Sequence, residues 1–193
     1  VKPASLEAFE AAVSPVFGNR SIKDVVTEKI AVIGENIGIR RVHVMEQVPG
    51  TKLFSYIHMG GKIGVLLRLK VSPDAVSDSS AIAEIGKDVC LHICASSPLA
   101  IDSTGISSAK VEKERVIYRE IAIQEGKPEK ILDKIVQGKV DKFYKDNCLL
   151  DQLFVKDAEK SVRAYIEAAA KAAGAAVVVD SFSRFQLGTS NDE

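Results

Sequence analysis

The longest helical pattern in the chain covers residues 107–146, and it limits the folds that are open to this sequence. The stretch is highly charged and is broken only at Gly126-Lys127-Pro128. An apolar stripe at helical spacing follows the break, formed by Leu132, Ile135, Val136, Val140 and Phe143. Two helices joined by a short Gly/Pro turn pack as an antiparallel hairpin. With alternating charges outside, such a hairpin projects into solvent or meets a partner.

A β-hairpin is predicted from two strand-like runs, residues 52–58 and 62–71, which Met59-Gly60-Gly61 separates. The second run places four apolar side chains on one face, namely Ile63, Val65, Leu67 and Leu69. Glycines between two such runs favour a tight turn.

Helices are predicted on both sides of this hairpin. Their ranges are residues 5–13, 21–33, 79–94 and 161–173. The second has Ser21 as its N-cap and Gly34 as its stop. The third carries an apolar stripe of Ile82, Ile85, Val89 and Ile93, and Ser97-Pro98 ends it.

An internal repeat is suggested by two segments with the order helix, glycine, strand. In residues 25–46, the apolar residues change parity inside the segment 37–46, which predicts a strand with a bulge near Arg40 and Arg41. In residues 164–187, the helix is followed by Gly174 and by a strand through Leu187, and the polar tail 188–193 is expected to fray.

Composition excludes several classes of protein. The formal net charge is zero over 193 residues, whereas a nucleic-acid binder shows a basic excess. The longest apolar runs, of about ten residues, are too short to span a bilayer, and no signal peptide follows Val1. Three cysteines without an export signal indicate reduced thiols in the cytoplasm. Because the sequence does not begin with Met, we expect its natural N-terminus to lie upstream.

No catalytic, cofactor or metal site is predicted. The glycine-rich run at residues 60–64 opens a strand rather than a helix, so it lacks the helix N-terminus that binds phosphate. On a helix, His92 lies about 200° from Cys90, while Cys94 shares the face of Cys90. We therefore interpret these residues as two buried thiols and one histidine at a helix edge. His58, beside the Gly-Gly turn, is either a plain surface histidine or a contact residue held on the sheet edge.

Several segments resemble the elongation factor Ts family, in the family's order. The clearest are KIAVIGENIGIRR (residues 29–41), YIH with GKIGVL (56–58 and 61–66), LHICASSP (91–98) and RFQLG (184–188). They are similar to the family's KIGENI-x-x-RR, Y-x-H-x-G-[RK]-IGVL, MHVAA-x-x-P and RFELG. The segments EKER (112–115), EGKP (125–128) and LLDQLFV (149–155) resemble its helical-hairpin landmarks.

The resemblance implies an α+β fold of two related small sheet-plus-helix subdomains with an inserted antiparallel helical hairpin. The N-subdomain remnant would take residues 1–50, and the C-subdomain residues 51–105 and 151–188. The helical hairpin would take 106–150, and a flexible tail 189–193. The family's helical N-terminal domain and its TDFV motif are absent from this sequence, so we expect it to begin just after that motif.

The resemblance also implies a function: guanine-nucleotide exchange on the translation GTPase elongation factor Tu, through protein contacts, with no covalent chemistry and no cofactor. The implied partner-binding residues are His58 with Gly60 and Gly61 of the turn, and Ile33 before Gly34. Three more would face domain 3 of the partner, although they fit strand core as well: Val178, Phe182 and Phe185. The alternative is a structural or oligomerisation module without exchange activity, and a homodimer stays open.

Overall fold

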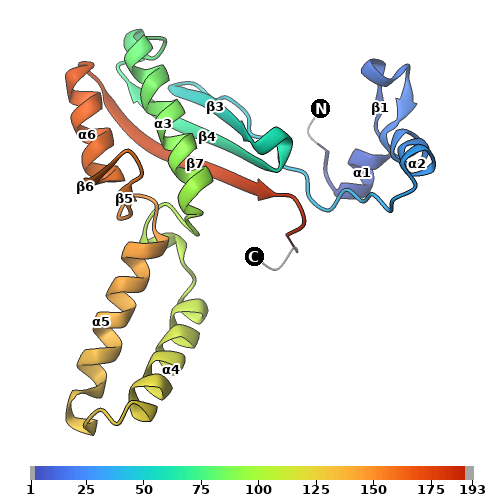
Figure 1. The fold of residues 1–193 in the computed structure, drawn as a ribbon. Helices are drawn as coiled ribbons and strands as arrows, with labels where there is room; N and C mark the ends of the chain where they lie inside the picture. Colours follow the sequence, from blue (N-terminus) through green and yellow to red (C-terminus); the bar gives the residue numbers. More distant parts are fainter. Residues whose placement is uncertain (1–2, 190–193) are drawn as a thin grey trace. The chain divides into compact units, whose positions relative to one another are not determined.

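The chain forms two compact units in a computed structural model that describes residues 3–189. One unit comprises the residues up to Met45 and those from Gly188 onward, and the other comprises Glu46–Leu187 (Figure 1). Residues 1, 2 and 190–193, which include most of the tail predicted to fray, lie outside the described residues. The fold class is α+β, as predicted.

The larger unit is built on a three-stranded antiparallel sheet in the order β3-β4-β7. Strands β3 (Thr51–His58) and β4 (Ile63–Ser72) form the predicted hairpin, with His58 opposite Ile63. Strand β7 (Ala176–Gln186) pairs with the other edge of β4. The register shifts between Arg68 and Leu69, which makes β7 bulge at that point.

Two helices cover one face of this sheet, α3 (Ser80–Ser96) and α6 (Val162–Ala172) (Figure 1). The apolar stripe predicted on α3 is fully buried against alternate residues of β4, which are Val65, Leu67, Leu69 and Val71. The predicted stop is confirmed, because Ser97 adopts a left-handed φ of 48°. Hydrophobic burial on this one face therefore fixes which side of the β-hairpin points inward.

The charged stretch forms the predicted helical hairpin from α4 (Ser108–Gln124) and α5 (Glu129–Asn147). Val111 and Ala122 of α4 are buried, as are Leu132, Val136, Val140 and Phe143 of α5. At its base, Ala100 and Cys148 form a parallel bridge that joins the two connecting segments. The hairpin projects away from the sheet (Figure 1).

A short hairpin after α5 was not predicted. It consists of β5 (Leu153–Phe154) and β6 (Asp157–Ser161), and three short 3₁₀ turns complete the described part of this unit: η2 (Met59–Gly61), η3 (Asp74–Val76) and η4 (Ser103–Gly105). Strand β5 has only two residues, and the five residues of β6 (DAEKS) are almost all polar, so neither shows the apolar alternation that reveals a strand.

The smaller unit contains α1 (Leu6–Glu10), η1 (Pro15–Phe17), α2 (Ile22–Ile33) and two strands of two residues, β1 (Val13–Ser14) and β2 (Arg20–Ser21). Helix α1 ends earlier than predicted, because Val13 starts β1. The limits of α2 are confirmed: the Ser21 hydroxyl accepts a hydrogen bond from the N–H of Asp24, and Gly34 has a φ of 78°. Neither helix contains a buried residue.

The strand predicted at residues 37–46, with its bulge at Arg40 and Arg41, is wrong. Residues 36–48 belong to no helix or strand. A strand needs a neighbour that accepts its backbone hydrogen bonds, and no strand of the described part pairs with this segment. The predicted repeat of helix, glycine and strand therefore fails in its first copy, where only the helix and the glycine form.

Candidate functional site

The turn at the end of the β3–β4 hairpin has an unusual backbone. Met59, Gly60 and Gly61 follow one another with φ values of 50°, 65° and 98°. Glycine adopts positive φ at no steric cost, whereas the same backbone conformation is sterically strained at Met59. A Cβ atom at Gly60 or Gly61 would meet nothing within 4 Å, so the turn needs these glycines for their conformation and not for space. The result is a tight turn that exposes 60% of Met59.

His58 lies directly before this turn and is held by Tyr56. The two residues share one face of β3, and the Tyr56 hydroxyl oxygen is 3.0 Å from Nδ1 of His58. Their rings are stacked, with centroids 5.7 Å apart and an angle of 27° between the planes. Both side chains are half-buried. Tyr56 is not among the predicted contact residues, although its spacing of two residues from His58 on a strand indicates that the two side chains are neighbours.

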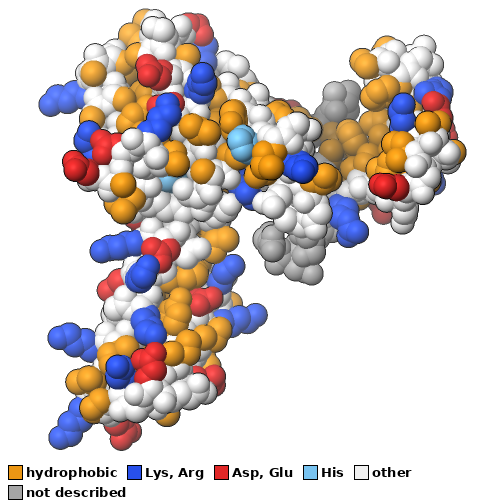
Figure 2. Space-filling view, in the orientation of Figure 1, with side chains coloured by type: hydrophobic (Ala, Val, Ile, Leu, Met, Phe, Trp, Pro, Cys, Tyr) orange, Lys and Arg blue, Asp and Glu red, His pale blue; other side chains and the backbone are white. Residues whose placement is uncertain are grey.

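Apolar side chains lie at the same end of the sheet as His58, and those of Ile57 and Phe185 project to the opposite face because side chains alternate along a strand. Ile57 is 66% exposed, and Leu187, whose N–H donates to the carbonyl oxygen of Lys62 over 2.8 Å, is 76% exposed. Phe185 is paired with Gly64 in the sheet, beside Ile57. We name these five residues the tip patch: Ile57, His58, Met59, Phe185 and Leu187. Figure 2 shows hydrophobic side chains gathered at this end of the sheet.

The other predicted contact residues lie in different places. Ile33, the last residue of α2, is 55% exposed and belongs to the smaller unit. Phe182 lies opposite Leu67 and packs against the core. Val178 lies near the other end of β7 and is 58% exposed, so it is not a core residue. Of the predicted contact residues on β7, Phe185 thus lies at the same end of the sheet as His58 and the two glycines, on the face opposite to His58.

His92 is buried rather than at a helix edge, which corrects the prediction. Its Nε2 is 2.9 Å from Oε1 of Gln152, and its Nδ1 accepts a hydrogen bond from the N–H of Val155 over 3.2 Å. Nε2 therefore carries the proton and donates it. The helical projection failed here because α3 is covered by the sheet on one side and by the segment after α5 on the other. Burial lowers the pKa of His92.

The two cysteines of α3 are buried thiols, as predicted. Burial raises the pKa of Cys90 to about 12. Within residues 3–189, no group of three His, Cys, Asp or Glu side chains is arranged to hold a metal ion.

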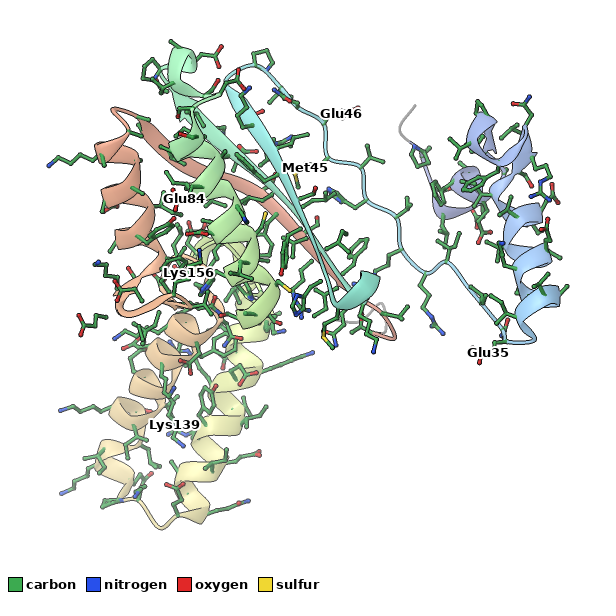
Figure 3. All side chains as sticks on the ribbon, turned by 45° about the horizontal axis from the view of Figure 1, so that its top comes forward. Glu35, Met45, Glu46, Glu84, Lys139 and Lys156 are labelled. Atoms are coloured by element: carbon green, nitrogen blue, oxygen red, sulfur yellow. The ribbon has the colours of Figure 1, made fainter. Side chains whose placement is uncertain are left out.

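A buried carboxylate on α3 has one charged and one neutral hydrogen-bond donor beside it. Asp88 is 4% exposed, and its oxygens accept hydrogen bonds from Nζ of Lys156 over 2.5 Å and from the hydroxyl of Tyr165 over 2.9 Å. Lys156 extends from the β5–β6 hairpin toward α3 (Figure 3). Because both partners reach Asp88 from other elements, this group ties α3 to α6 and to the short hairpin. It leaves no free charge for chemistry.

The tip patch offers one imidazole at an end of the sheet that exposes apolar side chains. Within residues 3–189, none of the helices combines the length and the hydrophobicity that a membrane span requires.

Comparison with known proteins identifies the family. The family model described as Elongation factor TS matches residues 1–189. The chain is 40% identical to the elongation factor Ts of Clostridium botulinum (strain ATCC 19397 / Type A) over 170 residues, which cover 88% of this chain and 54% of that protein. It is 41% identical to the elongation factor Ts of Trichlorobacter lovleyi over 186 residues, 96% of this chain and 60% of that protein. The chain thus spans little more than half the length of the curated relatives it matches. On these matches, this chain belongs to the elongation factor Ts family.

Proposed function

We propose that this chain is the part of a guanine-nucleotide exchange factor that contacts elongation factor Tu through the tip patch. The observation that carries the proposal is the position of His58. It lies beside the positive-φ turn, at an end of the sheet that exposes apolar side chains, and at the place where the chain's motif resembles the family's partner contact. Aromatic and apolar groups on a fixed scaffold are what a protein–protein contact requires.

Exchange by such a surface needs no covalent step. A factor that binds the nucleotide-free GTPase better than the nucleotide-bound form must weaken nucleotide binding by the same factor. The tip patch would act by holding the partner in the state that has released GDP. The pairing of His58 with Ile63 in the β3–β4 ladder supports this role, because it fixes the backbone that carries the imidazole before the partner binds.

The other predicted contacts fit this proposal to different degrees. Phe185 belongs to the tip patch, and Val178 and Ile33 have enough exposed surface to meet a partner. Phe182 is turned toward the core, so we leave it out of the proposed contact.

The experiment is release of labelled GDP from elongation factor Tu, with and without the chain, for the unchanged protein, His58→Ala and His43→Ala. His43 is an exposed histidine outside the tip patch, so its variant is a matched control. We expect faster release with the unchanged chain and with the control, and a loss of roughly tenfold in affinity for Tu in His58→Ala, the size of a contact worth about 1.4 kcal/mol.

The outcomes separate the two levels of the proposal. Binding to Tu without faster release would keep the contact but remove exchange activity from this part of the chain. Equal affinity of His58→Ala and the unchanged chain would remove His58 from the contact.

A second candidate function is self-association through the helical hairpin. Helix α4 exposes more than a third of each of four aliphatic side chains, namely Val116, Ile117, Ile121 and Ile123. A second copy would cover them by forming a four-helix bundle. Sedimentation equilibrium of the unchanged chain and of a variant with Ile117→Glu and Ile123→Glu tests this. A monomer in both cases would exclude the candidate.

A further inference from the structure

We propose that Tyr56 is a positioning residue for His58, holding its imidazole in the tautomer that offers an Nε2–H to the partner. The inference deepens the proposed function and rests on it. It also specifies the chemistry of the partner group, which must be a hydrogen-bond acceptor such as a backbone carbonyl or a carboxylate.

The contact between the two rings is local and well defined. Residues two apart on a strand project to the same face, so Tyr56 and His58 are neighbours on β3. The hydroxyl oxygen and Nδ1 are 3.0 Å apart, within hydrogen-bond distance, and the stacked rings restrict rotation of the imidazole. The strand fixes both backbones through its pairing with Val65 and Ile63 of β4.

The direction of this hydrogen bond decides the tautomer. A phenol carries its proton at neutral pH and donates it to a free imidazole nitrogen. If Nδ1 accepts, the single proton of the neutral ring lies on Nε2. Nε2 has no hydrogen-bond partner within the part of the chain that the structure describes. The donor is therefore left available at the edge of the tip patch.

Fixing the ring matters because a free histidine at a turn would divide its population between two tautomers and several rotamers. Only the fraction with the correct donor and orientation could bind, and the apparent affinity would fall by that fraction. Tyr56 removes this loss before the partner arrives.

The first test reads the tautomer directly, by ¹⁵N NMR of the histidine side chains in the unchanged chain and in Tyr56→Phe. The variant keeps the ring and removes only the hydroxyl. We expect one Nε2–H tautomer of His58 in the unchanged chain and a mixture in the variant. His92 serves as the internal reference, because its partners Gln152 and Val155 hold its tautomer in both proteins. An unchanged His58 tautomer in the variant would overturn the proposal.

The second test is a double-mutant cycle on affinity for elongation factor Tu. Tyr56→Phe should weaken binding roughly three- to tenfold in the unchanged chain, and should change nothing in a His58→Ala background. Tyr144→Phe, which removes a half-buried phenol from the helical hairpin, is the control. The same loss in both backgrounds would mean that Tyr56 acts on the fold and not through His58, which would overturn the proposal.

The two tests also separate this inference from the proposed function. If His58→Ala binds Tu as tightly as the unchanged chain, the contact itself is wrong, whatever the tautomer. If His58→Ala weakens binding but Tyr56→Phe does not, the contact stands and the positioning role of Tyr56 is wrong.

Discussion

Replacement of Gly86 by alanine tests how closely helix α3 approaches the sheet. Gly86 is buried in the middle of α3, and a Cβ atom there would lie 2.3 Å from Cδ1 and 2.4 Å from Cγ of the Phe54 ring. Carbon atoms in contact are normally about 3.5–4.0 Å apart, so the helix or the ring must move by about 1 Å. Overpacking of this kind costs about 1–3 kcal/mol, against a gain of about 1 kcal/mol in helix propensity. We expect Gly86→Ala to destabilise the protein by up to about 2 kcal/mol.

Gly138 provides the matched control. It also lies inside a helix, α5, but it is exposed and a Cβ atom would meet nothing within 4 Å. Gly138→Ala should therefore show only the propensity term and stabilise the protein by about 0.5–1 kcal/mol. Because the propensity term is common to both variants, the difference between their free energies of unfolding, about 1–3 kcal/mol, measures the overpacking against Phe54.

Urea unfolding followed by the helical circular dichroism signal measures both variants, since both helices belong to the larger unit. A third variant, Phe54→Leu, completes a cycle, because a smaller side chain makes room for the added methyl group. We expect Gly86→Ala to cost less by at least about 1 kcal/mol in the Phe54→Leu background. If Gly86→Ala is as stabilising as Gly138→Ala, or if the two changes at Gly86 and Phe54 are additive, the close approach is refuted.

Three further predictions concern buried groups. Burial lowers the pKa of His92, so as the pH falls the unfolded chain binds a proton that the folded chain does not. The contribution of His92 to stability is therefore fully present above the usual pKa of about 6.5 and falls as the pH drops toward the folded pKa. His92→Gln should flatten the profile of the free energy of unfolding measured from about pH 7 to about pH 5. Tyr165→Phe should cost about 1.5–3 kcal/mol in urea unfolding, because it removes a 2.9 Å hydrogen bond to the buried carboxylate of Asp88, and an unchanged midpoint would contradict this. Burial raises the pKa of Cys90 to about 12 and that of Cys148 to about 11, so a thiol reagent at about pH 8 should label them only after unfolding, and rapid labelling of the native protein would argue against it.

The sequence predicted most of the elements that bury an apolar face. The stripe on α3 and the alternation on β4 were readable because the buried residues recur with the period of the helix or the strand. The caps of α2, Ser21 and Gly34, were readable because capping is decided within a few residues of the chain. The tip turn was readable from its glycines.

The predictions that proved wrong depended on contacts between distant parts of the chain. Residues 37–46 have the composition of a strand, but a strand exists only where another strand pairs with it. His92 was placed at a helix edge because one helix seen alone has an exposed side, whereas here Gln152 and Val155 cover that side from about sixty residues further along the chain.

The candidate site also has features that the local sequence predicts and features that only tertiary contacts decide. By itself, the sequence determined that His58 stands beside a tight Gly-Gly turn at the end of a strand, since turn geometry and strand period are local properties of the chain. Only the tertiary structure decided which residues lie near it. Strand β7 brings Phe185 and Leu187 to the same end of the sheet, and its pairing with β4 packs Phe182 against the core. The reason is that the pairing of β7 with β4 joins residues more than a hundred positions apart, and no local pattern encodes which of them will meet.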